Sequence, residues 1–510
     1  MSLKIRALKN ILSSWGGLAT NIAVGLFLSP YILHHLGDDA FGLWVLIFSL
    51  TGYYGIFDFG IRSSLVRYVS KFQATGDREE LARLINTCFF TYSCIGAILL
   101  VPTFLGGFYV EHIFHVPPGF LRDARILFIM VGVSLALGFP LGISGGILEG
   151  LQRFYLLNWT NIVAMLLRAV LVVYVLRTGH GLLAVALVTV ALPLVGAAVR
   201  VVIAHRLLTV PYGWKYVSRG SLRQVASYGS VTFMIIVAGR LRFKTDAVII
   251  GSFLSAGAIT FFSIGGRLVD YATEVVSSLA QIFVPMSSHF HASGNFLQLR
   301  KIFIAGNRAC ALITLPLTVT LIVMGKSVIE AWVGPRYVSS YLVLLILLIP
   351  SALYMAQSTS NRILFGMGLH KSLAYVVLLE GIANVILSIA LIRPLGIVGD
   401  AIGTAIPLLC TSLFFLPRHM CRHLNIPVRK FLVEAYTYPL LLCIPMSVVM
   451  VFMQRYFYAH HYLQLAVNLV AGFAAYGIGL FWFVLTREPL GIEARMRVSR
   501  YFRESGASES

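Results

Sequence analysis

The sequence predicts an all-α integral membrane protein with about fourteen transmembrane helices. Of its 510 residues, 58% are hydrophobic and only 12% are charged, and the mean hydropathy is +0.84. Soluble domains carry about 25% charged residues. A soluble core cannot hide this much apolar surface, so lipid is the expected solvent for most of the chain. The net charge of +20 is spread between apolar segments, which argues against nucleic acid as a partner.

Apolar runs of about 20 residues are the signature of single membrane crossings. Fourteen such runs follow one another, and no loop between them is long enough to form a domain. Their approximate ranges are 10–33, 41–66, 84–107, 124–148, 155–176, 182–204, 224–250, 258–284, 302–324, 340–361, 373–392, 399–417, 431–453 and 463–485. We therefore expect the function to be carried by helices and short connections.

The distribution of Lys and Arg between the loops predicts one orientation. Cytoplasmic loops of membrane proteins carry the excess of these residues. With both termini on one side, the loops of the opposite side hold only seven: Arg122, Arg125, Arg177, Lys326, Arg336, Arg393 and Arg455. Both termini are therefore expected in the cytoplasm, with residues 491–510 as a cytoplasmic tail. The basic start runs into a long apolar stretch without a cleavage site, so we expect it to remain as the first span.

An internal repeat predicts two lobes. The stretch KFQATGDREELARL (71–84) aligns without gaps with HFHASGNFLQLRKI (289–302), at an offset of 218 residues. We interpret residues 1–210 and 211–425 as two six-helix lobes related by a pseudo-twofold axis along the membrane normal, because each lobe has an even number of spans. Residues 426–490 add spans 13 and 14. Substrate sites in such folds lie between the lobes, which rock to give alternating access.

Three stretches of the first lobe resemble motifs of a known transporter family. They are LGDDAFGLW (36–44), DFGIRSSLVRYVSKFQATGDREEL (58–81) and GILEGLQRF (146–154). They are similar to motifs of Wzx-type polysaccharide or O-antigen flippases, which are polysaccharide biosynthesis proteins of the multidrug/oligosaccharidyl-lipid/polysaccharide (MOP) exporter superfamily. The second lobe matches such motifs less well.

This resemblance implies a fold and a function. The expected fold is MATE-like, with two C-terminal helices added to the two lobes. The expected function is the movement of a polyprenyl-diphosphate-linked oligosaccharide outward across the inner membrane, for surface polysaccharide such as lipopolysaccharide. The expected partners are this lipid-linked oligosaccharide, membrane lipid and other membrane proteins of polysaccharide assembly.

The seventh span carries an unusual set of charges in the sequence VAGRLRFKTDAVIIGSF. A lone cation at the bilayer centre costs about 2.5–3.5 kcal/mol on insertion scales, so it needs water, protein or a counter-ion. Arg240 and Lys244 share one helical face that has no acid, which favours an anionic ligand. With Arg242, Arg267 and Arg62 they form the candidate cationic cavity for the substrate. Arginine suits phosphate because it donates two parallel hydrogen bonds.

Acidic residues within the spans are candidates for ion or proton coupling. They are Asp58, Asp246, Asp270, Glu274 and Glu380. Asp270 and Glu274 share a helical face, where two carboxylates resist joint ionisation and can hold one proton between them. Asp58 and Asp246 each lie four residues from an arginine and have a purely structural interpretation as ion pairs. Coupling to protons, to sodium or to the membrane potential alone remains open.

The sequence contains no GxSxG, HExxH or P-loop motif, so we expect a transporter and not an enzyme, without a cofactor or a metal site. The six cysteines form no CxxC pair. The alternatives are a peptidoglycan-precursor flippase, a multidrug antiporter and, in another class, a membrane glycan polymerase or glycosyltransferase. An antiporter for cationic drugs should have an acidic cavity, and a polymerase needs larger loops than these.

Overall fold

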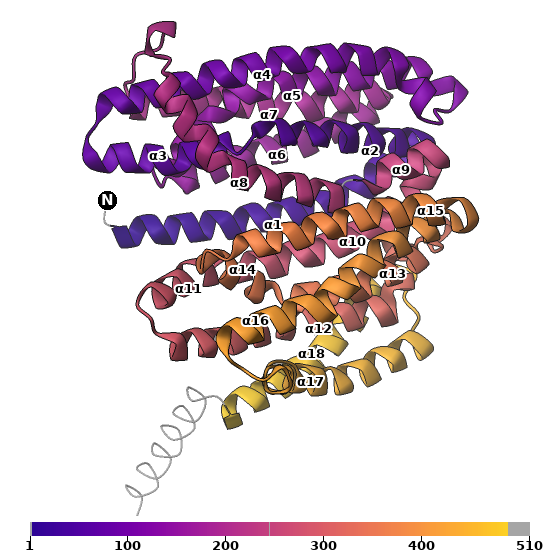
Figure 1. Cartoon of the computed structure of the whole chain (residues 1–510). Coiled ribbons are helices and arrows are strands. Elements are labelled where there is room, and N and C mark those ends of the chain that lie inside the picture. The colour runs from indigo at the N-terminus through magenta and orange to yellow at the C-terminus, as the bar shows by residue number, and fades with distance from the viewer. Residues whose placement is uncertain (1–2, 244, 488–510) are drawn as a thin grey trace, which may run out of the picture. The chain divides into compact units, whose positions relative to one another are not determined.

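The structure is a computed structural model that describes residues 3–243 and 245–487, all of whose regular elements are helices (Figure 1). The all-α fold predicted from the sequence is confirmed. Lys244, a predicted cavity residue, lies outside the described residues, as does the predicted tail 491–510.

The chain divides into two compact units. The first contains Met1–Ser278, Leu342–Pro350 and Gly368–Thr411. Its α-helices are α1 (Leu3–Leu36), α2 (Asp38–Gly52), α3 (Ile61–Thr75), α4 (Arg78–Ile113), α5 (Leu121–Gly150), α6 (Phe154–Arg177), α7 (Leu182–Leu207), α8 (Arg219–Phe243), α9 (Asp246–Phe253), α10 (Ala256–Ala280) and α15 (His370–Cys410). Three short 3-10 helices connect them: η1 (Tyr53–Asp58), η2 (Pro118–Phe120) and η3 (Trp214–Tyr216).

The second unit contains Leu279–Tyr341, Ser351–Met367 and Ser412–Ser510. Its helices are α11 (Phe283–Ala292), α12 (Phe296–Val333), α14 (Ser358–Gly366), α16 (Leu416–Leu424), α17 (Val428–Tyr456) and α18 (Tyr462–Arg487). Helix α13 (Ser340–Ala356) has residues in both units. These units do not coincide with the lobes 1–210 and 211–425, which stay a prediction.

The chain is a multi-pass membrane protein. Within the described residues, ten helical stretches are long and apolar enough to cross a membrane, and the bent pair α13–α14 raises the number to eleven. One of these stretches, Ser372–Leu424, covers two predicted spans and is kinked at Gly396. The predicted spans 224–250 and 258–284 are not among them, because charged residues lower the hydropathy of α8 and α10. The predicted number of fourteen is therefore not established.

The two segments of the sequence repeat form the same local structure. Helix α3 ends at Gly76, whose φ is 73°, and Asp77 caps α4 by accepting a hydrogen bond from the backbone N–H three residues on. In the second unit Gly294 has a φ of 68°, and Asn295 caps α12 in the same way. Glycine is favoured at a left-handed helix end, and Asp or Asn at an N-cap. The turn geometry thus explains the matched residues.

The second predicted span, 41–66, is broken into α2, η1 and α3. Phe59 and Gly60 both adopt left-handed backbone conformations, with φ of 48° and 73°. A Cβ on Gly60 would lie 2.4 Å from the backbone oxygen of Gly229, so α8 packs directly on this turn. Only glycine fits such a close backbone approach. On the two sides of this break, η1 and α3 both pack against α8.

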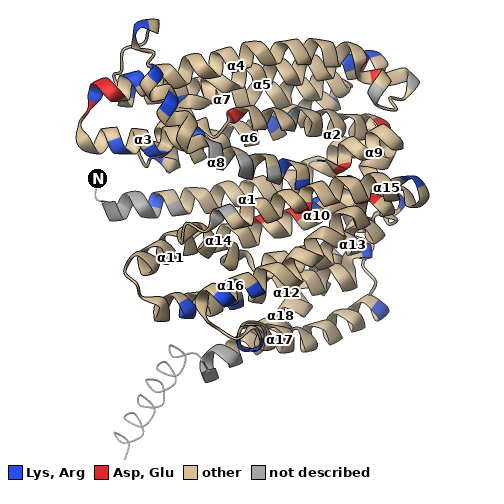
Figure 2. Ribbon diagram, viewed as in Figure 1, with Lys and Arg blue, Asp and Glu red and all other residues tan. Residues whose placement is uncertain are grey.

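Helix α5 packs against α4 and against α7 within the first unit (Figure 1). In Figure 2 these helices are mostly tan, and their blue and red residues lie near the helix ends. This is the pattern expected of helices whose middles face lipid or other apolar helices. The charges that lie within spans are therefore exceptions that need a local explanation.

Candidate functional site

A charged cavity of about 400 Å³ lies within the first unit, enclosed by α1, α2, α6, α7, α8 and α10. Its charged lining residues are Arg168, Arg240, Arg267, Asp270 and Glu274. Hydroxyl and amide groups from Asn21, Ser29, Ser49, Thr189 and Tyr271 line it as well. This volume is in the range of small-molecule sites. Helices from both predicted lobes contribute to its walls.

Arg240 extends from α8 toward the backbone of η1. Its Nη2 atom lies 2.7 Å from the position that a Cβ on Gly55 would occupy, and Gly52 lies next to the same guanidinium. The absence of side chains at these two glycines leaves the space that the guanidinium fills. Glycine in η1 therefore sets the position of Arg240 at the cavity wall.

Arg168 on α6 and Arg267 on α10 face the same cavity, where their like charges repel each other. The Nε atom of Arg168 is buried and makes no hydrogen bond to any described residue. A like-charged pair in a low-dielectric site favours an anion between its members. Sequence reasoning left Arg168 out of the candidate cavity. The sequence feature that could have identified Arg168 is its position as a single cation within the apolar run 155–176.

The acids of the cavity come from α10. Glu274 accepts a hydrogen bond from Asn21 of α1 through Oε2, at 3.0 Å. Asp270 lies one helical turn earlier on the same face and lines the same cavity. Three arginines and two carboxylates give the lining an excess of positive charge if all are ionised. The cavity is thus suited to a ligand that carries more than one negative charge.

Arg242 is placed apart from this cavity. Its side chain is 4% exposed, and its Nε atom lies 2.7 Å from Oε1 of Glu380, which is 2% exposed. Residues two apart on a helix point in nearly opposite directions, so Arg240 and Arg242 face different neighbours. The structure therefore pairs Arg242 and Glu380 between α8 and α15, and neither residue lines the cavity.

Two further carboxylates, Asp246 and Asp400, interact with each other in the first unit. The hydroxyl of Thr404 donates to Oδ1 of Asp246 at 3.0 Å. Asp400, on α15, is fully buried, and its carboxylate is close enough to Asp246 for the two charges to repel each other. Sequence reasoning missed Asp400, because it stands at the start of the predicted span 399–417 and had the appearance of a loop residue.

The predicted Asp58–Arg62 pair has a different geometry. The two residues stand on opposite sides of the break at residues 59 and 60, so they do not form an ion pair within one helix. Asp58 accepts hydrogen bonds from the backbone N–H of Arg62 and from the hydroxyl of Tyr92. The guanidinium of Arg62 instead lies 2.6 Å from Glu149 of α5. Arg62 and Tyr92 line a separate pocket of about 240 Å³.

Two other arginines within spans have local structural partners. Arg200 donates from Nη1 to Oδ1 of Asn161 at 2.9 Å. Arg308, in the second unit, donates from Nε to the backbone oxygen of Glu434 at 2.9 Å. These contacts tie α7 to α6 and α12 to α17. The described intramembrane cations thus divide into those that join helices and those that line the cavity.

Comparisons with known proteins agree with this membrane fold. Residues 35–342 match the model of a family described as polysaccharide biosynthesis protein. The membrane protein EpsK of Bacillus subtilis (strain 168) is 22% identical over 417 residues, which cover 79% of this chain and 80% of EpsK. A protein assigned as an O-antigen transporter in Shigella flexneri is 20% identical over 441 residues, which cover 81% of this chain and 98% of that protein.

Solved transporter structures share the fold. The lipid II flippase MurJ, in an inward closed conformation, superposes with a TM-score of 0.73 at 16% identity, over 93% of this chain and 98% of MurJ. An inward-facing multidrug resistance MATE transporter of the MOP superfamily superposes with a TM-score of 0.67 at 13% identity, over 81% and 96% of the two chains. Because the family match spans more than half of the sequence, the chain belongs to the polysaccharide biosynthesis protein family, and its fold is that of MOP-superfamily transporters.

Proposed function

We propose that this protein flips a polyprenyl-diphosphate-linked oligosaccharide from the cytoplasmic to the outer leaflet of a bacterial inner membrane, for surface polysaccharide biosynthesis. Both termini then lie in the cytoplasm, as the distribution of Lys and Arg indicates. The family membership and the Shigella flexneri relative support transport of a polysaccharide precursor. Alternating access between the two predicted lobes supplies the route.

The observation that carries the proposal is the cavity with Arg168, Arg240 and Arg267 in its lining. A diphosphate presents several anionic oxygens, and guanidinium groups recognise them through charge-assisted, paired hydrogen bonds. The hydroxyl and amide groups beside the arginines suit the sugar hydroxyls. The polyprenyl tail stays in the lipid. Each arginine then contributes to binding the charged group that cannot cross a bilayer unaided.

The charge of the cavity disfavours the drug-antiporter alternative. A cationic drug would meet three guanidinium groups and only two carboxylates in this lining. Like charges placed together in a site of low dielectric are unfavourable. An anionic headgroup binds favourably in the same cavity, because its attraction to the guanidinium groups offsets the loss of its hydration.

The membrane potential favours outward movement of such a substrate. A diphosphate with about two negative charges gains roughly 4–5 kcal/mol per 100 mV on leaving a negative interior. The sequence contains no nucleotide-binding P-loop, so direct use of ATP is not part of the proposal. Potential-driven movement also needs a step that resets the empty carrier.

We assign that resetting step to a cation, either a proton or sodium, held by Asp246 and Asp400. Both carboxylates are close together in the first unit, and Asp400 is fully buried. Two neighbouring carboxylates of low solvent exposure bind one cation more readily than they remain jointly ionised. We expect Asp400→Asn to reduce transport at least tenfold in proteoliposomes and to remove its dependence on the coupling ion. Asp123→Asn, at the start of α5, is the control. Unchanged ion dependence in Asp400→Asn would contradict this assignment.

The direct test of the proposed function is the leaflet location of the precursor in a deletion strain. A flippase deletion should accumulate the lipid-linked oligosaccharide on the cytoplasmic leaflet, where it is protected from a membrane-impermeant glycosidase or periodate added to intact spheroplasts. Expression of the intact gene should restore its accessibility. Accumulation on the outer leaflet would instead point to a polymerase, and an absence of accumulation would remove this protein from the transport step.

A further inference from the structure

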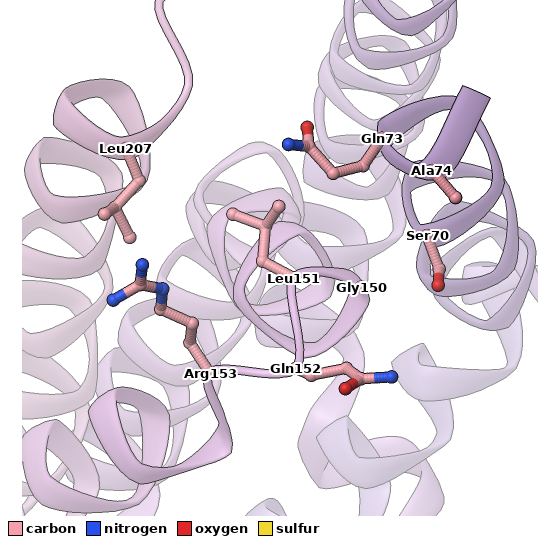
Figure 3. Close-up of a pocket in the computed structure, with 8 residues that line it drawn as sticks. All are labelled: Ser70, Gln73, Ala74, Gly150, Leu151, Gln152, Arg153 and Leu207. Carbon is pink, nitrogen blue, oxygen red and sulfur yellow. The ribbon is translucent and has the colours of Figure 1, made fainter. Parts of the chain in front are cut away.

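A third pocket, of about 350 Å³, lies in the first unit where α3, α5 and α7 end. Its lining residues are Ser70, Gln73, Ala74, Gly150, Leu151, Gln152, Arg153 and Leu207. Figure 3 shows Ser70, Gln73 and Ala74 along α3 on one side of Leu151, with Arg153 and Leu207 on the other. The pocket contains the final residues of the GILEGLQRF motif, which the charged cavity does not use.

Gln152 adopts a conformation that glutamine rarely takes. Helix α5 ends in a Schellman motif, in which the N–H of Gln152 donates to the oxygen of Glu149 and the N–H of Arg153 donates to the oxygen of Leu148, each at 2.8 Å. The residue at the position of Gln152 must be left-handed, and its φ is 55°. Glycine is the usual residue there. Asn10 of α1 holds the carbonyl of Gln152 with a hydrogen bond of 3.1 Å.

A strained residue that is not glycine requires a reason, and such residues cluster at ligand sites. The helix end itself needs only the backbone of this residue, which glycine supplies without strain. The side chain of Gln152 instead lines the pocket. We therefore infer that the carboxamide of Gln152 serves a ligand in the pocket and not the helix end.

The groups in the pocket define the chemistry of a ligand. A hydroxyl (Ser70), two carboxamides (Gln73 and Gln152) and a guanidinium (Arg153) line it, and no carboxylate does. No acid of the described residues lies within ion-pair distance of Arg153. Residues 150–245 contain neither Asp nor Glu. The guanidinium suits a phosphate, and the amides and hydroxyl suit sugar or glycerol hydroxyls.

We propose that this pocket binds the phosphate-bearing, hydroxyl-rich headgroup of a lipid at the cytoplasmic face. The placement at that face rests on the orientation in the proposed function. Two lipids have this chemistry: the lipid-linked oligosaccharide, held here before it enters the charged cavity, and phosphatidylglycerol of the surrounding leaflet. In both cases Arg153 binds the phosphate, while Gln152 and Gln73 bind hydroxyl or phosphate oxygens.

The decisive variant is Gln152→Gly. It removes the carboxamide and gives the helix end its preferred residue, so the protein should fold at least as well as the wild type. Asn425→Gly is a matched control, because Asn425 ends α16 in the same motif with a φ of 49° and lines none of the three pockets described above. Arg153→Ala is the second test variant.

Binding is measured on the purified full-length protein in phosphatidylcholine nanodiscs, with radiolabelled undecaprenyl diphosphate in one arm and phosphatidylglycerol in the other. We expect Gln152→Gly and Arg153→Ala to weaken binding of at least one lipid about tenfold, with an unchanged or higher thermal midpoint for Gln152→Gly. Asn425→Gly should bind as the wild type does.

The two arms separate this proposal from the proposed function. If Gln152→Gly and Arg153→Ala weaken the binding of undecaprenyl diphosphate alone, the pocket is a substrate-loading site. If they weaken the binding of phosphatidylglycerol alone, the pocket is a membrane-lipid site. Suppose that Arg240→Ala weakens the binding of undecaprenyl diphosphate, while Gln152→Gly and Arg153→Ala keep wild-type affinity for both lipids. The pocket proposal is then overturned, and the transport proposal stands. Failure of the wild type to bind either lipid overturns it as well.

Discussion

Replacing Arg240 with alanine should abolish surface polysaccharide while leaving the protein in the membrane at its wild-type level. The guanidinium of Arg240 fills space beside Gly55 in the cavity wall, so its removal takes one of three cations from the site that we assign to the diphosphate. A lost charge-assisted contact to phosphate typically costs about 1.5–3 kcal/mol, which is roughly 10- to 150-fold in affinity. Surface glycan is measured by immunoblotting of whole-cell extracts.

Matched variants make this result specific. Arg168→Ala and Arg267→Ala should behave like Arg240→Ala, because all three residues line the same cavity. Arg177→Ala removes an exposed cation at the end of α6 and should leave the glycan unchanged. Arg240→Lys should retain partial function, since lysine keeps the charge but loses the paired hydrogen bonds. Wild-type glycan in all three cavity variants would refute the assignment of this cavity to the substrate.

Glu380→Ala should destabilise the folded protein by about 3–5 kcal/mol, the usual cost of removing one member of a buried ion pair. Arg242 and Glu380 are almost completely buried, with 2.7 Å between Nε and Oε1. Alanine leaves the arginine charge in place without the carboxylate that faces it. The measurement is the free energy of unfolding in mixed micelles titrated with denaturing detergent.

The double variant Arg242→Met with Glu380→Leu tests the cause of that loss. Replacing a whole buried ion pair by apolar residues of similar volume is often neutral or stabilising. We therefore expect the double variant to recover most of the stability that Glu380→Ala loses. Glu434→Ala, whose carboxylate belongs to an exposed pair with Lys430, should change stability by less than about 1 kcal/mol. Equal losses in the double variant and in Glu380→Ala would mean that packing, not the charge, sets the effect.

The sequence predicted the fold class because composition and the length of apolar runs report directly on the solvent that surrounds a helix. Its repeat predicted two lobes, which stay a prediction, and the positive φ of Gly76 and Gly294 explains why those two glycines match. The charges of span 7 and span 8 predicted that Arg240, Arg267, Asp270 and Glu274 would be functional candidates, and all four line the cavity.

Other parts of the site depend on contacts between distant segments, which a single sequence does not display. Arg242 differs from Arg240 because α15 supplies Glu380 to one face of α8 and not to the other. Arg168 belongs to the cavity only because α6 and α10 border the same space in the folded chain. The break before α3 was hidden by an apolar run that continues through residues 59 and 60. The break between η1 and α3 is set by the backbone conformation of residues 59 and 60, which hydropathy does not report.

The acid-free stretch between residues 150 and 245 has a consequence for how the protein responds to the cell interior. At the predicted cytoplasmic face its charges come from arginine and lysine, whose ordinary pKa values lie above about 10. Acidification of the cytoplasm therefore leaves the positive charge that attracts anionic lipid to this face unchanged. Delivery of precursors to this face would persist under conditions that neutralise carboxylate-based surfaces elsewhere.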